Sequence, residues 1–287
     1  MARGKSIFRV RRFKSLTPLL RHLDALPHAG HAWAFRGLSN VDYGLKTTFE
    51  RAAIERFGLK KAVYERELGL LRKFRRHAHQ FIQHLPEPEE RIEWLTLMQH
   101  YGAPTRLLDW TYSHHVALYF AVRDARAGTP SAIWAIDTQW LADVAIATLP
   151  VDLQVQFVLD RNMKQHELSN EVLWRATPVK CVLPLNSFNL NARQSVQQGL
   201  FLAPGDVGVS FEANLRATVR GRRERQNHLR CFIIETSRPF LRRAFEHLNR
   251  VNVTSASMFP GLEGFAEHLS SLLPHAKALA IDEWERP

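Results

Sequence analysis

The pattern of apolar and polar positions predicts a mixed fold in which helices outnumber strands. Apolar residues recur at helical spacing in segments that mostly stop at Pro or Gly. These segments are 16–26, 47–57, 60–85, 89–100, 113–122, 138–160, 240–248 and 261–273. Short apolar runs bounded by turn residues predict buried strands at 31–36, 131–137, 179–185, 199–203 and 229–235. The order of these elements favours an α+β fold, a single helix-rich domain around a modest β-sheet.

The chain of 287 residues divides into three parts on this pattern. We expect a basic N-terminal helical lead-in over residues 1–30, the main domain over 31–273 and a C-terminal tail over 274–287. No apolar run approaches the roughly 20 residues of a membrane helix. The basic N-terminus lacks the apolar core of a signal peptide, so we expect a soluble cytoplasmic protein without a membrane partner.

Composition narrows the class of protein. A hydrophobic content of 45% is ordinary for a globular protein and excludes a disordered or fibrous chain. The only two cysteines, Cys181 and Cys231, are too few for a disulfide framework or a four-thiolate zinc site. We expect both to pack as small apolar side chains in a protein from a reducing compartment.

The formal net charge of +11 is concentrated in a few segments. One of them, residues 216–230, holds six arginines against a single glutamate. Such a segment is either a solvated cationic face or a surface that binds polyanions such as nucleic acid. The candidate nucleic-acid contacts are Arg216, Arg220, Arg222, Arg223 and Arg225.

The first segment with candidate chemistry is Phe35-Arg36-Gly37. An arginine at the end of a buried strand, before an expected glycine turn, presents a fixed guanidinium at the edge of the sheet. This group binds phosphate or carboxylate in a bidentate way. A structural ion pair is the alternative.

The second segment, residues 99–113, places many polar side chains on one link between two helices. We expect Arg106 and Asp109 to pair with each other, or with backbone carbonyls, and to lock this loop. The hydroxyls of Thr111 and Ser113 either bind a ligand or cap the next helix, and a cap is the expected role of Ser113.

The third segment is residues 193–201, where Arg193 and the amides of Gln197 and Gln198 precede a strand. These amides bind either a ligand or neighbouring backbone. Other chemistries lack their motifs: the sequence has no GxSxG elbow, no Walker loop, no GxGxxG and no HExxH. We therefore expect no metal.

These segments together resemble the FRG domain family, named for its Phe-Arg-Gly start. The strongest match is Gln99-His-Tyr-Gly-Ala-Pro-Thr-Arg-Leu-Leu-Asp-Trp-Thr111, followed by Ala117-Leu-Tyr-Phe-Ala121. Further matches are Tyr43, Leu45, Arg51, Ile133-Trp134, Gln197-Gln-Gly-Leu-Phe201 and Phe259-Pro-Gly-Leu-Glu-Gly264. Local departures are Thr47-Thr48, where a Pro-Ser pair is usual, and His114-His115, where a Pro and an apolar residue are usual. The family occurs in bacteria and phages and does not itself name an activity.

The order of motifs is also similar to that of Arg-Ser-Glu type ADP-ribosyltransferases, which implies a split β-sheet and a site for NAD. By this likeness Arg36, next to Gly37, holds the phosphates or ribose of NAD. Thr111 and Ser113 shape the nicotinamide-ribose pocket. Tyr101 or Tyr119 stacks on the nicotinamide.

The catalytic Glu of those enzymes is replaced here by Gln197, which offers a hydrogen bond but no charge. Either a carboxylate such as Asp109 or Glu171 then substitutes for that Glu, or the fold binds a nucleotide without transferring it. The resemblance thus implies a nucleotide-handling enzyme, either an NAD-dependent ADP-ribosyltransferase with an unidentified macromolecular acceptor or an NAD glycohydrolase. The alternative is a non-catalytic module that binds nucleic acid or a protein partner through its basic face.

Overall fold

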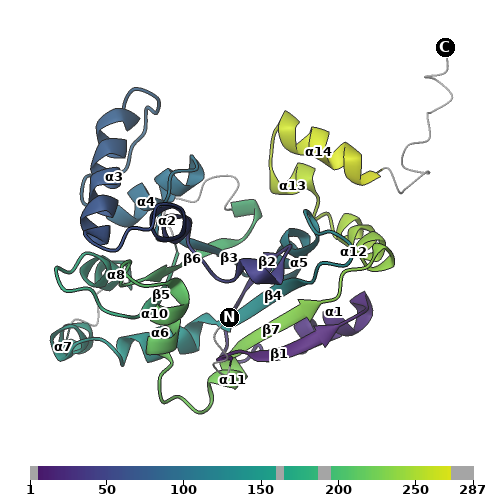
Figure 1. Cartoon of the computed structure of the whole chain (residues 1–287), viewed down its shortest axis with the longest axis horizontal. Coiled ribbons are helices and arrows are strands. Elements are labelled where there is room, and N and C mark those ends of the chain that lie inside the picture. The colour runs from purple at the N-terminus through teal and green to yellow at the C-terminus, as the bar shows by residue number, and fades with distance from the viewer. Residues whose placement is uncertain (1–5, 160–164, 187–194, 273–287) are drawn as a thin grey trace.

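A computed structural model gives the structure, which describes residues 6–159, 165–186 and 195–272 (Figure 1). The strands are β1 (Arg9–Phe13), β2 (Trp33–Leu38), β3 (Leu108–Thr111), β4 (Ser131–Asp137), β5 (Val182–Leu185), β6 (Gly199–Pro204) and β7 (Leu229–Ile234). The first helices are α1 (Leu16–Asp24), η1 (Val41–Tyr43), α2 (Thr48–Glu50), η2 (Arg51–Arg56), α3 (Val63–Ala78), α4 (Arg91–His100), α5 (His114–Val122) and α6 (Thr138–Ile146). The later helices are α7 (Val151–Leu159), α8 (Gln165–Leu173), α10 (Phe211–Thr218), α11 (Arg225–His228), α12 (Arg238–Arg250), α13 (Ser255–Met258) and α14 (Leu262–Leu272).

The strands form one mixed sheet in the order β1-β7-β4-β2-β3-β6-β5. β1 runs parallel to β7, and the other neighbours are antiparallel. β2 and β4 pair along the whole of β2, but β2 and β3 pair only at Phe35 and Thr111. The sheet therefore has a four-stranded half and a three-stranded half, joined at a seam between β2 and β3. The expected α+β fold is confirmed.

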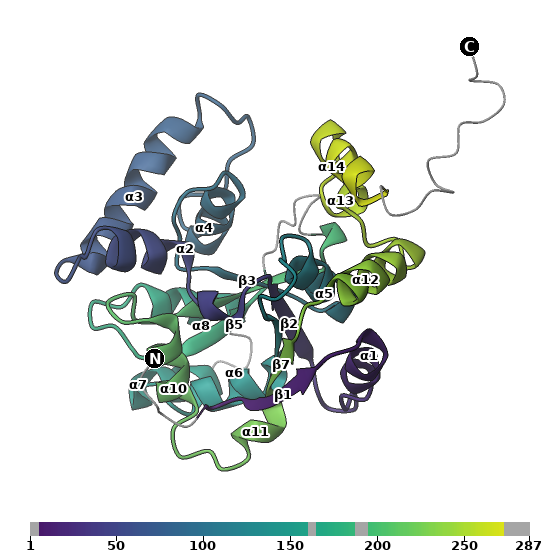
Figure 2. The ribbon, with the colours of Figure 1, turned by 45° about the vertical axis from the view of Figure 1, so that its right-hand side comes forward.

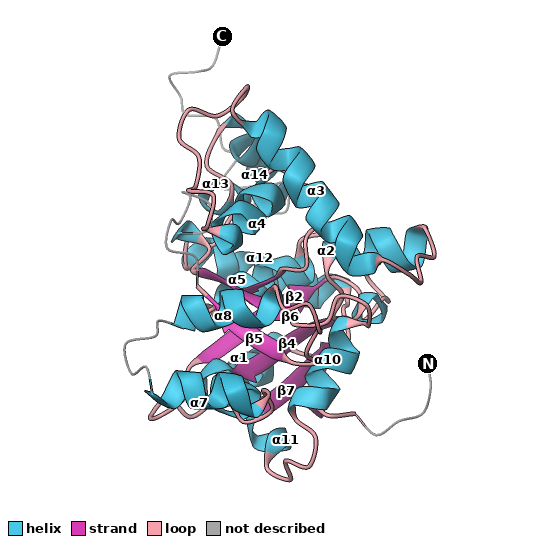
Figure 3. Ribbon diagram, turned by 90° about the vertical axis from the view of Figure 1, so that its left-hand side faces the viewer, coloured by secondary structure: helices cyan, strands magenta, loops and turns pink. Residues whose placement is uncertain are grey.

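Helices cover both faces of this sheet (Figure 3). Helices α1, α5 and α12 pack on one face of the four-stranded half, where Leu19, Phe35, Leu118 and Phe232 share a core. Helices α6 and α10 pack on the opposite face, and a third core unites α3, α4 and α8 with β5 and β6. All seven residues of β4 are buried, as its apolar sequence predicted. No described helix has the length and apolar character needed to cross a membrane.

The N-terminal segment contains a strand that the sequence pattern did not predict. β1 lies at the edge of the sheet and pairs with β7 from Arg9↔Arg230 to Phe13↔Ile234. Its sequence is mainly arginine, and four of its five residues are exposed, so it carries no buried apolar run. The expected helix follows as α1. The boundary at residue 30 stays a prediction, and the tail over 274–287 lies outside the described residues.

Helix boundaries follow the capping residues. Thr47 accepts a hydrogen bond from the Glu50 amide at 3.0 Å, and Ser113 accepts one from the Val116 amide at 3.3 Å. The Ser113 cap was predicted, and the two caps fix the starts of α2 and α5. The helix expected over 60–85 is shorter, since α3 begins after Ala62 at φ 53° and ends at Ala78.

Gly37 was expected in a turn, and that prediction is wrong. It lies inside β2, paired with Ile133 of β4. A Cβ at this position would lie 1.8 Å from the carbonyl oxygen of Ala117 in α5. Glycine is therefore needed because the α5 backbone packs directly on the strand.

Candidate functional site

A cleft of about 390 Å³ opens beside the seam between β2 and β3. This volume is within the usual range for small-molecule sites, which is about 300–1,000 Å³. Its polar lining residues come from both halves of the sheet and from α4: Arg36, Ser39, Tyr43, Thr48, Thr96, Gln99, His100, Asp109, Trp110, Thr111, Asp124 and Gln197. In Figure 2, α3 and α4 stand on one side of α5 and of strands β2 and β3, and α12, α13 and α14 stand on the other.

Arg36 is held in the cleft wall by the neighbouring strand. Its Nη1 donates a hydrogen bond to the backbone carbonyl of Asp109 at 2.5 Å and lies 3.9 Å from the Asp109 carboxylate. Burial lowers the pKa of Arg36, the Asp109 charge raises it, and the Arg51 charge lowers it, with a net lowering. The guanidinium is thus oriented and only partly neutralised by its surroundings.

Asp109 places a carboxylate on the three-stranded half, opposite Arg36. Its side chain is 62% exposed, and both of its oxygens accept from Gln99 Nε2 at 3.0 Å. The Gln99 side-chain oxygen accepts from the Thr105 hydroxyl, which fixes the amide orientation. Gln99 therefore holds Asp109 in place while leaving it accessible from solvent.

Thr111 and Gln197 form the floor of the cleft where β3 meets β6. The Thr111 hydroxyl donates to the Gln197 backbone carbonyl at 2.6 Å and accepts from the Ser113 amide at 3.0 Å. Gln197 Nε2 donates to the Met258 carbonyl at 3.1 Å. Among the described residues, the hydrogen bond of the Gln197 side chain is made by Nε2 and not by the side-chain oxygen.

Three buried polar atoms on residues of the cleft lining lack a hydrogen-bond partner among the described residues. They are Arg36 Nε, Thr96 Oγ1 and Trp110 Nε1. An unpaired buried polar group costs roughly 1–3 kcal/mol, and a ligand that pairs with it removes that cost. Unpaired polar groups are thus concentrated on residues that line the cleft.

The predicted ion pair between Arg106 and Asp109 is wrong. Arg106 is fully buried and binds the carboxylate of Glu67 in α3, through Nε at 2.9 Å and through Nη2. Its Nη1 donates to the carbonyls of Leu173, Pro204 and Gly205. Arg106 lies at a bend before β3 and is buried in the core, whereas Asp109 lies within β3 and lines the cleft.

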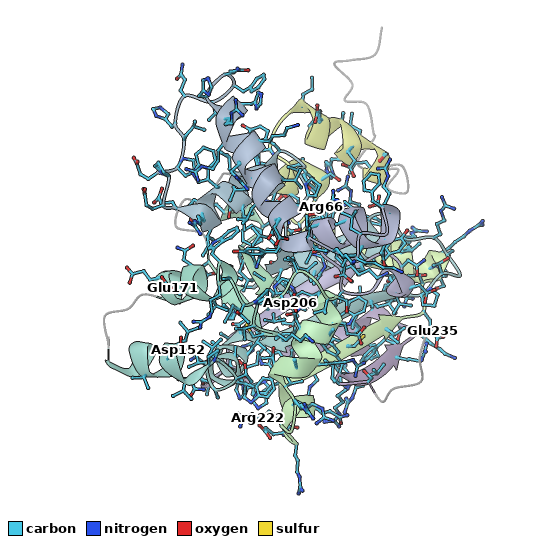
Figure 4. The ribbon with its side chains drawn as sticks, turned by 60° about the vertical axis from the view of Figure 1, so that its left-hand side comes forward. Arg66, Asp152, Glu171, Asp206, Arg222 and Glu235 are labelled. Atoms are coloured by element: carbon cyan, nitrogen blue, oxygen red, sulfur yellow. The ribbon has the colours of Figure 1, made fainter. Side chains whose placement is uncertain are left out.

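Several other predicted site residues lie outside the cleft lining. Tyr119 is buried in the core, where its hydroxyl contacts Ser255 Oγ at 2.8 Å, so its position does not support stacking on a ligand in the cleft. Tyr101 is exposed and does not line the cleft, and Ser113 acts as the helix cap. Glu171 projects from α8 (Figure 4), and it lines a separate hollow together with Arg91. Arg193 lies outside the described residues.

The arginines of residues 216–230 lie away from the cleft. Arg216 pairs with Glu212 one turn earlier in α10, and Arg225 donates to the Arg222 carbonyl. Arg222 projects near the bottom of the view in Figure 4, well below Arg66 of α3. Arg220 and Arg223 are exposed. These residues therefore form a surface separate from the cleft.

Sequence reasoning missed part of the cleft. Thr96, Phe120, Asp124 and Phe201 line it, although none was a predicted site residue. Gln99 belonged to the recognised motif, but its hold on Asp109 depends on α4 and β3 lying side by side. Cys181 and Cys231 are both buried and free, as expected.

Comparison with known proteins supports the resemblance read from the motifs. The family model described as the FRG domain matches residues 31–129, which include Arg36, Gln99, Asp109 and Thr111. This match confirms the FRG resemblance over that part of the chain. No curated protein and no solved structure matches the chain at a significant level.

Proposed function

We propose that the cleft beside the β2–β3 seam binds NAD and that the protein cleaves its nicotinamide–ribose bond. The observation that carries this proposal is the pairing of a guanidinium and an accessible carboxylate across one cleft, Arg36 on β2 and Asp109 on β3. A guanidinium suits the pyrophosphate of NAD. A carboxylate suits the positive charge that develops on the ribose during cleavage.

In the proposed reaction the bond between ribose C1′ and the nicotinamide nitrogen breaks, and its electron pair leaves with neutral nicotinamide. Water or an acceptor nucleophile then forms the new bond to C1′ and releases one proton. Asp109 stabilises the oxocarbenium-like charge and can accept that proton. ADP-ribose transfer to a macromolecule and hydrolysis to free ADP-ribose differ only in the nucleophile.

Gln197 has a positioning role in this proposal. Its Nε2 donates to the Met258 carbonyl. In this proposal its side-chain oxygen accepts a hydrogen bond from a ribose hydroxyl. The charge supplied by Glu in the ADP-ribosyltransferases comes from Asp109 instead. Glu171 is not part of the proposed site, because it lines a different hollow.

The test combines NAD calorimetry with detection of released nicotinamide. Asp109→Asn should keep NAD binding but lower cleavage by about 10²–10³-fold, the range for losing one electrostatic contact to a transition state. Arg36→Lys should weaken binding about tenfold to a hundredfold, because an ammonium group cannot reproduce the bidentate contact. Asp42→Asn and Arg242→Lys, outside the cleft, are the matched controls. Absence of NAD binding by the wild-type protein, or equal cleavage by Asp109→Asn, contradicts the proposal.

A second candidate function is binding of a polyanion such as nucleic acid by the basic surface. The observation that favours it is a cluster of like charges at the edge of the sheet. Burial lowers the pKa of Arg230, and the charges of Arg9 and Arg11 lower it further. Arg230 Nη1 is also buried without a hydrogen-bond partner among the described residues.

Duplex binding at several salt concentrations tests this second function. Replacing Arg222, Arg223 and Arg225 with Gln should reduce the slope of log affinity against log salt by close to three charges' worth. The matched control replaces Arg66, Arg72 and Arg76, three exposed arginines of α3. Equal slopes for the two triple variants would contradict this function.

A further inference from the structure

Two histidines and one aspartate from distant parts of the chain meet at one end of the adjacent strands β2, β4 and β7. His31 precedes β2, Asp137 ends β4, and His228 ends α11 immediately before β7. Each offers one metal-ligating atom, and these atoms all lie within 4.8 Å of one another. It is the one such group of three found among the described residues. It lies at the beginning of β2, whereas the cleft lies toward the end of that strand.

The strands hold the three residues in register. β4 is the central strand of β2, β4 and β7, with Trp33 opposite Asp137 and Leu229 opposite Ile136. All three ligands are therefore within two residues of paired positions in the sheet. Sites built on such rigid elements keep their geometry better than sites built on long loops.

Asp137 is a buried carboxylate that is directed at both imidazoles. Its side chain is 1% exposed, and no Lys or Arg among the described residues pairs with it. Its Oδ1 accepts from the backbone amides of Ala32 and Trp140. Its Oδ2 lies 2.5 Å from His31 Nδ1 and 2.8 Å from His228 Nδ1. One oxygen is thus committed to the backbone, and the other is shared by two nitrogens.

Aromatic neighbours fix the two rings and leave them accessible. Trp140 stacks on His228 with the centroids 4.5 Å apart and the planes 4° apart, and Trp33 stacks on His31 at 6.1 Å. The histidine side chains are partly exposed, 25% for His31 and 16% for His228. An ion can therefore reach them from solvent although Asp137 itself is covered.

The geometry points to a divalent transition-metal site formed by His31, Asp137 and His228, with Zn²⁺ as the cation its donors fit. Two imidazoles and one carboxylate are a known three-ligand zinc set, in which water or another ligand takes the fourth position. In the present arrangement each Nδ1 contacts the carboxylate. When the ring proton of each histidine sits on its other nitrogen, both Nδ1 atoms offer a lone pair within 4.8 Å of each other and of Asp137 Oδ2. A buried carboxylate needs a positively charged partner, and the metal would be that partner for Asp137.

Calorimetric titration of chelator-treated protein with Zn²⁺ tests this site, with Co²⁺ absorption as a second readout of the ligand geometry. We expect one saturable site per chain and a rise in melting temperature with zinc. His31→Gln and His228→Gln should each weaken binding at least as much as the 10–100-fold typical for loss of an outer-shell partner. His115→Gln is the matched control, because His115 belongs to a separate cluster with His114 and His247.

Two results overturn the assignment. One is the absence of saturable Zn²⁺ binding by folded wild-type protein, which would leave a purely hydrogen-bonded cluster. The other is wild-type affinity in both His31→Gln and His228→Gln, which would place the metal elsewhere. Circular dichroism of each variant establishes that it is folded. Should a variant fail to fold, the zinc titration and the Co²⁺ spectrum of the wild-type protein still test the assignment. A single surface histidine does not give the absorption bands of four-coordinate Co²⁺.

Discussion

Glu67→Gln should be among the most destabilising single changes in this protein. Glu67 is 1% exposed and is the carboxylate that neutralises the fully buried guanidinium of Arg106. The substitution keeps the size of the side chain and removes its charge. Arg106 would keep its three carbonyl contacts and its position 5.1 Å from the Trp174 ring centroid, but no anion would balance it.

Loss of one partner of a buried ion pair costs about 3–5 kcal/mol, because the remaining charge stays buried. For domains of roughly 150–250 residues, each kcal/mol corresponds to about 2–4 °C in melting temperature. We therefore expect Glu67→Gln to lower the melting temperature by about 6–20 °C. Thermal melts followed by circular dichroism measure this directly, and urea unfolding gives the free energy independently.

Asp109→Asn is the matched control, since the exposed Asp109 carboxylate does not contact Arg106. Its effect should stay near that of a surface charge, about 1 kcal/mol or less. The double variant Glu67→Gln with Arg106→Gln should cost less than the sum of the two single changes, because no unpaired charge remains. A Glu67→Gln melting temperature within about 2 °C of wild type, or strict additivity in the cycle, would refute the reasoning.

Three further predictions concern packing, pH and thiol chemistry. Gly37→Ala should destabilise the fold by about 3 kcal/mol or more in urea unfolding, because the Cβ meets helix backbone, whereas Gly69→Ala in the open middle of α3 should stabilise by about 0.5–1 kcal/mol. Burial lowers the pKa of His115 from 6.5 to about 4. The unfolded state therefore binds the proton first, and stability present above pH 6.5 should fall progressively as the pH drops toward 4. His115→Gln should flatten that fall, and a pH profile identical to wild type would contradict it. Burial raises the pKa of Cys181 and Cys231 to about 12, so a thiol reagent should modify them only after unfolding.

Local patterns predicted the elements with the strongest periodicity. Strand β4 and the helix that begins after Ser113 matched because an apolar run and a capping residue are local signals. β1 was missed because an arginine-rich edge strand lacks the apolar alternation on which strand prediction depends. β3 was missed for a different reason, since it is only four residues long and follows a proline-containing loop.

The candidate site was predicted in part. The motif placed Arg36, Asp109, Thr111 and Gln197 in one region, and all four line the same cleft. Their partners could not be inferred, because a partner depends on which way each side chain faces and on contacts across the fold. Arg106 illustrates this point: its carboxylate, Glu67, is 39 residues away on a helix with no local sequence link to the motif.

The narrow pairing between β2 and β3 has a consequence for local unfolding. Because Phe35 and Thr111 are the one paired position across the seam, packing and the hydrogen bond from Arg36 to the Asp109 carbonyl, rather than a hydrogen-bond ladder, hold the two halves of the sheet together. Amide protons bordering the seam should then exchange through small opening fluctuations, at a lower free energy than those between β4 and β7. A molecule that contacts both Arg36 on β2 and Asp109 on β3 would link the two halves of the sheet across the seam. Its binding would slow that exchange and couple occupancy of the cleft to the rigidity of the whole sheet.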